Sequence, residues 1–240
     1  MKNATFVIAV LLLVLARPAE ADFVQTYNTG FANGGVIPDG SRTGWTDTET
    51  VSVPGTSLNQ MTDVSVTLNL SGGWNGDLYA YLVHSSGFAV LLNRVGVGTG
   101  NTVGYGNAGM NVVLNDAAGV NIHSYGGLSV PTGSYQPDGR NIGPLSSAAT
   151  FSSTLPSALL SSFTGLNGNG SWTLFIADVS PGDVMTVNSW GLDMAAVPEP
   201  GSMVEGAVAV LFLGGVVGLE ATAAFGVNSC RGAAGTLPPR

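Results

Sequence analysis

"NGNGSWTLFIADVSPGD", residues 167–183, joins an alternating apolar run to a turn that contains proline and glycine. Every second residue of the run is large and apolar, and these residues are Trp172, Leu174 and Ile176. Strict alternation of this kind places one face of a β-strand against a core. After the Ser-Pro-Gly-Asp turn the pattern resumes with Trp190, Leu192 and Met194. The pattern predicts a β-hairpin whose two neighbouring strands each bring a tryptophan to the core.

Two aspartates, Asp178 and Asp183, stand on either side of this turn. Aspartate is a common turn residue because its side chain bonds to the nearby backbone. Other acids stand at similar turns, with Asp39 and Asp138 in Pro-Asp-Gly and Asp77 in Asn-Gly-Asp. We therefore predict that Asp178 and Asp183 close the hairpin and perform no chemistry.

The same alternation recurs in three further segments, residues 63–70, 77–84 and 88–95. Residues 96–110 and 126–150 are rich in Gly, Ser and Pro, which predicts long loops. One stretch, 155–163, has the composition of a short helix with Pro156 in its first turn. Short strands, long loops and one small helix are typical of an all-β fold, here an antiparallel jelly-roll-like β-sandwich or barrel.

The N-terminus has the pattern of a secretory signal peptide. Lys2 precedes an uncharged apolar run over residues 6–16, and Ala-Glu-Ala at 19–21 offers a cleavage site. The run is shorter than the roughly 20 apolar residues that a membrane helix needs. We predict that residues 1–21 are a signal peptide and that the exported chain begins at Asp22.

Charge and cysteine content exclude several classes of function. The chain has 7 Lys and Arg residues against 15 Asp and Glu, a formal net charge of −8 at pH 7. Such a surface repels phosphate backbones, so we expect no nucleic acid partner. Lys2 is the only lysine, which removes a lysine nucleophile from the exported chain. Cys230 is the only cysteine and cannot form a disulfide within the chain.

The other end of the chain also carries a targeting pattern, in residues 197–227. Pro198, Glu199 and Pro200 precede an apolar run from Met203 to Leu219. The prolines keep the approach extended, and the run is nearly long enough for a membrane-spanning helix. This segment resembles the PEP-CTERM sorting signal of exopolysaccharide-producing bacteria, in which such a motif precedes a C-terminal apolar helix and a basic cluster.

The PEP-CTERM resemblance implies processing by an exosortase-type enzyme and contact with cell-envelope or exopolysaccharide components. The chain would be held in the envelope through this segment or released outside the cell, with residues 228–240 as a tail. The sequence departs from the pattern because Glu220 follows the apolar run and the next arginine is Arg231. A plain C-terminal membrane anchor is therefore the alternative.

The body of the chain, residues 22–196, resembles the P domain (P/Homo B domain) of proprotein convertases over roughly residues 30–195. The motifs occur in the family's order: IPDG (37–40), WNGDLYAYLVHSSGFAVLL (74–92), VVLNDAA (112–118), ALLSSFTGLNGNGSWTLFIAD (158–178) and GDVMTVNSWGLDM (182–194). The family is a β-barrel that follows subtilisin-like catalytic domains and also occurs alone in exported bacterial proteins. The resemblance implies an association with serine-type endopeptidases and proteolysis.

The chain itself lacks the pattern of a catalytic triad, so we expect no enzymatic activity. A nucleophilic serine needs a histidine base, and that histidine needs an acid to orient it. Ser57 lies in Gly-Thr-Ser, but both histidines, His84 and His123, follow it and neither begins His-Gly-Thr. The stretch after Ser57 alternates like a strand and does not open a helix. We expect a turn at Ser57 and packing roles for both histidines.

Calcium is the one candidate cofactor that the sequence indicates. Carboxylates on the loops of an exported, acidic domain without disulfides suit the oxygen ligands that calcium prefers. Asp77, Asp116 and Asp178 occupy positions that resemble frequent acids of the P-domain family. The resemblance therefore makes these three residues candidate calcium ligands, although no Asp-x-Asp-x-Asp loop is present.

Three functions follow from these patterns. The first is a non-catalytic exported module that interacts with, or builds, the cell surface or exopolymer matrix. The second is an accessory module of a separately encoded subtilisin-like peptidase. The third is a carbohydrate-binding jelly roll that stacks sugars on exposed tyrosines, with Tyr79, Tyr81, Tyr105, Tyr125 and Tyr135 as candidates. An aromatic platform outside the core favours the third function, whereas aromatics buried between the sheets count against it.

Overall fold

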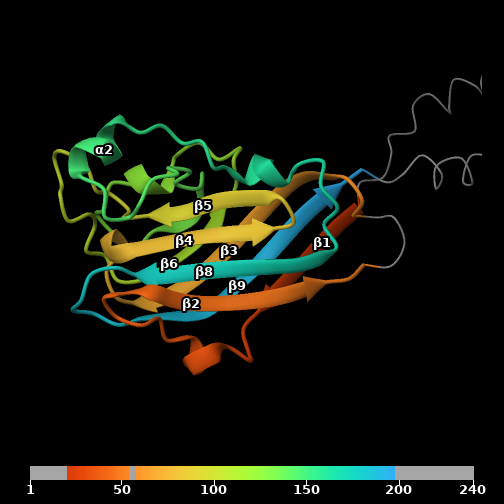
Figure 1. The fold of residues 1–240 in the computed structure, drawn as a ribbon, viewed down its shortest axis with the longest axis horizontal. Coiled ribbons are helices and arrows are strands. Elements are labelled where there is room, and N and C mark those ends of the chain that lie inside the picture. The colour runs from red at the N-terminus through yellow and green to blue at the C-terminus, as the bar shows by residue number, and fades with distance from the viewer. Residues whose placement is uncertain (1–20, 54–57, 198–240) are drawn as a thin grey trace, which may run out of the picture. The chain divides into compact units, whose positions relative to one another are not determined.

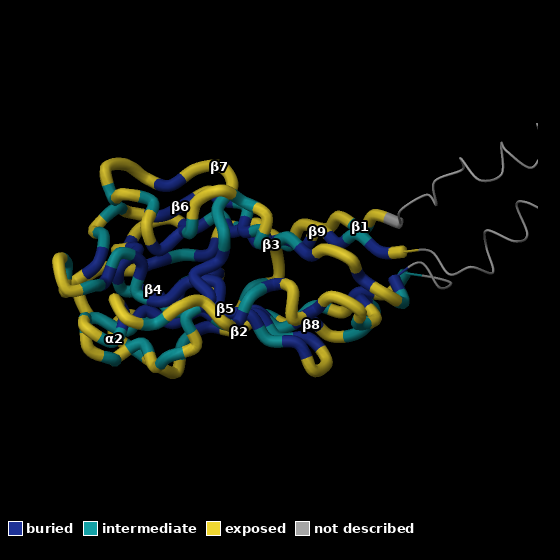
Figure 2. Tube along the Cα trace, turned by 90° about the horizontal axis from the view of Figure 1, so that it is seen from above, coloured by how far each residue is buried: buried dark blue, intermediate teal, exposed yellow. Residues whose placement is uncertain are grey.

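The computed structural model describes residues 21–53 and 58–197, and it confirms an all-β sandwich (Figure 1). One sheet has the order β1 (Ala21–Tyr27), β9 (Met185–Ala196), β3 (Met61–Gly72), β6 (Met110–Leu114) and β7 (Thr132–Tyr135). The other sheet has the order β2 (Ser41–Val51), β8 (Gly170–Asp178), β4 (Leu78–His84) and β5 (Gly87–Asn93). Figure 2 shows the buried residues gathered between the two layers.

The strands pair antiparallel except for β6 and β7, which are parallel. The predicted strands 63–70, 77–84 and 88–95 correspond to β3, β4 and β5, and their alternating apolar residues are buried. In β4, for example, Leu78, Ala80 and Leu82 are fully buried while the residues between them are half-buried. Alternation therefore identified each strand and the face that it turns to the core.

The predicted hairpin between residues 170 and 194 is wrong. β8 lies in the four-stranded sheet and β9 in the five-stranded sheet, so the two strands do not pair. Residues 179–184 cross from one layer to the other and do not fold back within one layer. Asp178 and Asp183 thus stand at the two ends of a crossing connection, and Trp172 and Trp190 are on strands of opposite sheets.

The predicted helix at 155–163 is also wrong in its position. The α-helix α2 spans Ala148–Ser153, and Ser147 caps it by accepting a hydrogen bond from the Thr150 N–H at 3.2 Å. Residues 155–159 form neither helix nor strand, and only a 3₁₀ turn, η4 (Leu160–Phe163), follows. Pro156 therefore does not begin a helix. The predicted loop 126–150 contains strand β7 and the start of α2.

The remaining 3₁₀ turns are short and lie between strands. They are η1 (Ala32–Gly35), η2 (Asn75–Asp77) and η3 (Ile122–Ser124). The segment after β7 runs along β5, because the Asp138 and Gly139 N–H groups donate to the Leu91 and Val90 carbonyls at 3.0 and 2.9 Å. This pairing covers the edge of β5 and fixes Asp138 beside the sheet.

Trp172 and Trp190 are the largest fully buried side chains, each with no exposed surface. Each indole N–H has a partner: Trp172 donates to the Gly168 carbonyl at 2.9 Å, and Trp190 donates to Asp47 Oδ2 at 2.7 Å. Burial of two large rings with satisfied N–H groups is strongly stabilising. The predicted core role of both tryptophans is confirmed by their burial.

The two described ends of the domain lie side by side, because Ala21 of β1 pairs with Ala196 of β9. We call this the tail end. The opposite end, formed by residues 73–77 and 179–184, is the loop end (Figure 1). The signal peptide over residues 1–20, the sorting motif Pro198–Pro200 and the apolar run after it lie outside the described residues. Within residues 21–53 and 58–197, no helix has the length and apolar character to cross a membrane.

We expect Trp172→Ala or Trp190→Ala to lower the free energy of unfolding by about 3–5 kcal/mol, since each leaves a large core cavity. That loss is a large part of the roughly 5–15 kcal/mol that stabilises an ordinary domain. Trp74→Ala is the matched control because Trp74 is 44% exposed, and we expect a change near 1 kcal/mol or less. Urea unfolding of the three variants measures the difference. Equal losses at Trp74 and Trp172 contradict the core assignment.

Candidate functional site

The loop end brings together two of the three predicted calcium ligands. Asp77 ends η2 and Asp178 ends β8, and the Val179 N–H donates to the Asp77 carbonyl at 2.9 Å. Asp39 and Asp183 also face this cluster, and both raise the pKa of Asp77 and Asp178 through their negative charge. A pocket of about 370 Å³ opens here, with Trp74 and Arg94 among its lining residues.

Asp178 is the most perturbed carboxyl group of this cluster. Only 1% of its surface is exposed, and burial raises its pKa from 3.8 to about 6. The Ser180 N–H, which donates to Asp178 Oδ1 at 3.2 Å, opposes the shift. Asp77 and the other neighbouring acids add to the shift. The carboxylate is therefore costly in its charged form, as expected for an acid held where a strand leaves its sheet.

Asp77 is partly compensated by a cation. Burial raises its pKa, while the Ser180 hydroxyl and the Arg94 guanidinium lower it. The Arg94 Nη2 atom lies 3.6 Å from Asp77 Oδ1, and the Arg94 Nε–H donates to the Gly76 carbonyl. Arg94 thus links η2 to the end of β5 and partly neutralises Asp77.

Asp116, the third predicted ligand, has a different environment. Its carboxylate accepts hydrogen bonds from the Leu160 and Ser161 N–H groups, at 3.1 and 2.7 Å, and so caps η4. Among residues 21–53 and 58–197, no group of three or more His, Cys, Asp or Glu side chains is arranged to hold a metal ion. The structure therefore brings Asp77 and Asp178 together but leaves Asp116 with a capping role. Calcium binding stays a prediction for the first two residues.

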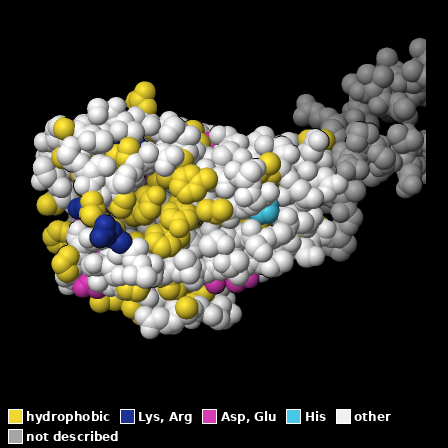
Figure 3. Space-filling view, in the orientation of Figure 1, with side chains coloured by type: hydrophobic (Ala, Val, Ile, Leu, Met, Phe, Trp, Pro, Cys, Tyr) yellow, Lys and Arg dark blue, Asp and Glu magenta, His cyan; other side chains and the backbone are white. Residues whose placement is uncertain are grey.

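A second candidate site lies on the outer face of the four-stranded sheet. Figure 3 shows an apolar patch over β4, β5 and β8. Its half-buried rings are Tyr79, Tyr81, Phe88 and Phe175, and we call them the aromatic face. The Tyr81 ring stacks on Phe175 at 4.7 Å and lies 5.5 Å from Phe88, measured between centroids. The rings form one continuous cluster across three strands.

Uncharged polar residues of β2 and β8 border one side of the aromatic face, whereas Figure 3 shows basic side chains at the left edge of the apolar patch. Thr46 of β2 pairs with Phe175, and the Thr48 and Thr173 hydroxyls are 2.9 Å apart. The outward positions of β4 from Tyr79 to Val83 carry no charged side chain. This neutral surface contrasts with the acidic loop end, although both belong to a chain of net charge −8.

The other three predicted tyrosines pack against the core. Tyr105 and Tyr125 are 4.9 Å apart, and Tyr125 lies 6.3 Å from Tyr135. The Tyr125 hydroxyl donates to Asn107 Oδ1 at 2.7 Å. Of the five candidate sugar-stacking residues, only Tyr79 and Tyr81 belong to the aromatic face.

Both histidines are buried and their ring nitrogens are occupied. His84 Nδ1 and Nε2 face the Ser171 and Asn167 carbonyls at 3.0 and 2.7 Å, and its ring stacks on Trp172 at 4.1 Å. His123 Nδ1 lies 2.6 Å from Asp138 Oδ2, and Nε2 lies 2.9 Å from the Val97 carbonyl. Neither ring offers a free nitrogen to a serine hydroxyl. Ser57 itself lies outside the described residues.

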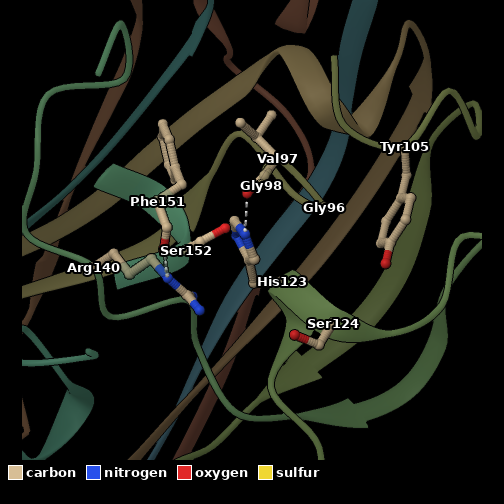
Figure 4. A pocket seen from close by; sticks show the side chains of 9 residues that line it. All are labelled: Gly96, Val97, Gly98, Tyr105, His123, Ser124, Arg140, Phe151 and Ser152. Carbon is tan, nitrogen blue, oxygen red and sulfur yellow. Dashed lines mark hydrogen bonds between the residues drawn. The ribbon is translucent and has the colours of Figure 1, made fainter. Parts of the chain in front are cut away.

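His123 also lines a pocket of about 250 Å³ on a different part of the domain (Figure 4). Residues 96–98, η3 and α2 supply its walls together with Arg140 and Tyr105. His123 and Tyr105 stand out in the sequence but Arg140 does not, because nothing in the spacing places these loops together. Pairing of residues 138–139 with β5 brings Arg140 to the pocket.

Comparison with known proteins gives fold neighbours only. No protein-family model and no curated protein matches the chain. The solved structures that resemble it include the serine protease of Aeromonas sobria in complex with its chaperone ORF2, and the serine protease of Aeromonas sobria. The first has 15% identity, a TM-score of 0.43 and coverage of 79% of this chain and 29% of that one. The second has 15% identity, a TM-score of 0.41, and coverage of 78% and 29%. The chain thus spans under a third of those structures, and its P-domain membership stays a resemblance.

Asp178 predicts a pH dependence of stability. Because burial raises its pKa from 3.8 to about 6, the folded state binds the proton more tightly than the unfolded state. Stability should therefore fall as pH rises from about 4 to 6. Asp178→Asn should flatten this dependence. At pH 7 its free energy of unfolding should be equal to that of the wild type or higher, with a gain of at most about 1 kcal/mol because solvent screens the charge.

Thermal melts of the wild type and Asp178→Asn between pH 4 and 7 measure the effect, and Asp22→Asn, at an exposed residue of β1 at the tail end, is the control. Each melt is repeated with calcium and with chelator. A calcium-dependent loss of stability in Asp178→Asn alone, of roughly 2.7 kcal/mol with calcium at 100 times its dissociation constant, makes the carboxylate a calcium ligand.

Proposed function

We propose that this chain is a non-catalytic exported module that binds polysaccharide of the cell-surface or exopolymer matrix through the aromatic face. The observation that carries the proposal is the ring cluster of Tyr79, Tyr81, Phe88 and Phe175 outside the core. Single exposed apolar residues are ordinary on protein surfaces, but a contiguous patch rimmed by polar groups marks an interaction site.

The chemistry of the aromatic face suits a sugar chain. Aromatic rings offer a flat apolar surface, and the tyrosine hydroxyls add polar tips at its border. Thr46 is exposed beside Phe175 and can bond to sugar hydroxyls. These features support a polysaccharide as the ligand.

The position of the aromatic face supports the same reading. The described chain ends leave together at the tail end, where Ala21 pairs with Ala196. The aromatic face lies on the broad side of the four-stranded sheet and not at that end (Figures 1 and 3). In this proposal residues 197–227 hold the module in the envelope, or an exosortase-type enzyme releases it from there. That anchoring is part of the proposal and rests on the Pro198-Glu199-Pro200 motif.

The non-catalytic part of the proposal is supported by the two histidines. A general base needs a free ring nitrogen within about 2.6–3.2 Å of the group that it deprotonates. The nitrogens of His84 and His123 all face carbonyl or carboxylate oxygens. We expect no covalent labelling of the chain by a serine-directed fluorophosphonate; labelling that disappears in Ser57→Ala overturns this part.

A peptidase is the alternative partner for the same face. An accessory module of a separately encoded subtilisin-like peptidase would use the aromatic face as a protein interface, since apolar aromatic residues are enriched at such interfaces. The chain would then bind a peptidase, Tyr81→Ala would lose this binding, and the chain would not bind polysaccharide. That set of results would favour the peptidase-accessory function over polysaccharide binding.

We expect Tyr81→Ala to weaken polysaccharide binding about tenfold, because it removes the ring at the centre of the cluster. Affinity electrophoresis of the chain in gels that contain neutral or acidic exopolysaccharide measures retardation. Trp74→Ala is the matched control because Trp74 is an exposed aromatic residue at the loop end. Retardation that is equal for wild type and Tyr81→Ala contradicts the proposed face. Loss of retardation in Trp74→Ala alone moves the site to the loop end.

A further inference from the structure

The pocket beside His123 differs from the rest of this acidic protein because it is built around a cation. Arg42, Arg94 and Arg140 are the basic residues, histidines aside, within residues 21–53 and 58–197. Arg94 is paired with Asp77, and Arg42 is exposed on β2. Arg140 lines the pocket, and its side chain is only 15% exposed.

The Arg140 guanidinium has N–H donors that make no hydrogen bond in the described residues. Its Nε–H donates to the Phe151 carbonyl at 3.3 Å, and Nη1 donates to Asp138 Oδ1 at 3.1 Å. Nη2 has no hydrogen-bond partner among the described residues. A guanidinium group has five N–H donors in a planar fork, which suits a carboxylate. The contacts that hold the fork in place thus leave part of it available to a ligand.

Asp138 does not cancel the positive character of the pocket. It is fully buried and faces both Arg140 and His123, whose Nδ1 lies 2.6 Å from Asp138 Oδ2. Because the carboxylate is behind these two side chains, it positions them and is not itself exposed to a ligand.

Two further hydrogen-bonding groups line the pocket without a partner in the described residues, the Tyr105 and Ser124 hydroxyls. Figure 4 shows Arg140, Phe151 and Ser152 on one side of the His123 ring, and Tyr105 and Ser124 on the other. The Tyr105 ring is held by two glycines with positive φ, Gly96 and Gly127. A Cβ atom at either would lie within 2.7 Å of a ring atom. The Tyr105 ring is therefore closely packed between the two glycines.

The size and the donors together define the ligand. A volume of about 250 Å³ is below the roughly 300–1,000 Å³ of pockets for drug-sized molecules, so it suits one small group. A guanidinium fork, two hydroxyls and a fixed aromatic wall match a carboxylate on a hydroxyl-rich ring. We propose that this pocket binds the carboxylate-bearing sugar residue of an acidic polysaccharide, with Arg140 on the carboxylate and Tyr105 and Ser124 on the ring hydroxyls.

The site is independent of the aromatic face. None of its lining residues belongs to that face, and it lies among loops that β5, η3 and α2 position. Tyr81→Ala should therefore leave it intact. Failure of the aromatic-face proposal and failure of this one are then separate experimental results.

Ser124 offers a test that leaves the fold alone, because it is exposed and its hydroxyl makes no hydrogen bond in the described residues. Ser124→Glu places a carboxylate beside Arg140, and Ser124→Lys places a second cation there. Ligand-observed saturation-transfer NMR on the full chain in detergent measures binding of sodium glucuronate, glucose and acetate, each at on the order of 10 mM. Ser86→Glu and Ser86→Lys, at an exposed turn residue, are the matched charge controls.

We expect glucuronate to bind more tightly than either glucose or acetate. Both Ser124 variants lose the hydroxyl and differ in charge, so we expect Ser124→Glu to bind glucuronate about twofold to fivefold more weakly than Ser124→Lys does, while the two Ser86 variants bind it equally. Thermal melts establish that each variant is folded. No glucuronate signal, or equal shifts in the Ser124 and Ser86 pairs, overturns the proposal. Acetate binding as tight as glucuronate binding reduces the pocket to a simple anion site and overturns the sugar assignment.

Discussion

The placement of β8 and β9 in opposite sheets is the constraint on which the rest of the domain depends. β8 lies between β2 and β4, and β9 lies between β1 and β3, so each is an inner strand of its sheet. The two strands bring Trp172 and Trp190 into the space between the layers, where both are fully buried. The connection 179–184 therefore joins an inner strand of one sheet to an inner strand of the other. The remaining strands pair on either side of these two.

This crossing explains the chemistry of the loop end. Asp178 is the last residue of β8, and the chain must leave the sheet immediately after it. Its carboxylate is covered by the crossing connection, which raises its pKa to about 6. A hairpin would have turned at the sheet edge and left the same carboxylate in water. The perturbed acid is thus a consequence of topology, and a pKa shift by itself does not make a functional site.

Of the nine strands in the described residues, the sequence predicted β3, β4, β5, β8 and β9, but not β1, β2, β6 and β7, and not that β8 and β9 lie in opposite sheets. Period-two alternation identified β3, β4, β5 and β8 and their buried faces, because burial acts on each strand separately. It predicted a hairpin at 179–184 because a Ser-Pro-Gly-Asp turn has the same composition whether it stays in one sheet or crosses to another. Proximity of Asp77 and Asp178 followed from the pairing of β4 with β8, whereas Asp116 caps η4 through backbone contacts that have no sequence signal. The Arg140 pocket was missed for the same reason, since non-periodic loops assemble it.

The two proposed binding surfaces differ in the charge of the groups nearest to the ligand, although both lie on one acidic molecule. A net charge of −8 repels an acidic polymer at long range, yet at physiological ionic strength that repulsion is screened beyond about 8 Å. Contact is then decided by the nearest groups, and those are uncharged at the aromatic face and cationic at Arg140. A polymer with both neutral and carboxylated sugars could occupy both surfaces, and two weak sites on one rigid domain add avidity without strong affinity at either. The acidic loop end would face away from such a ligand. Within about 8 Å its carboxylates are not screened and would repel the ligand's own carboxylates.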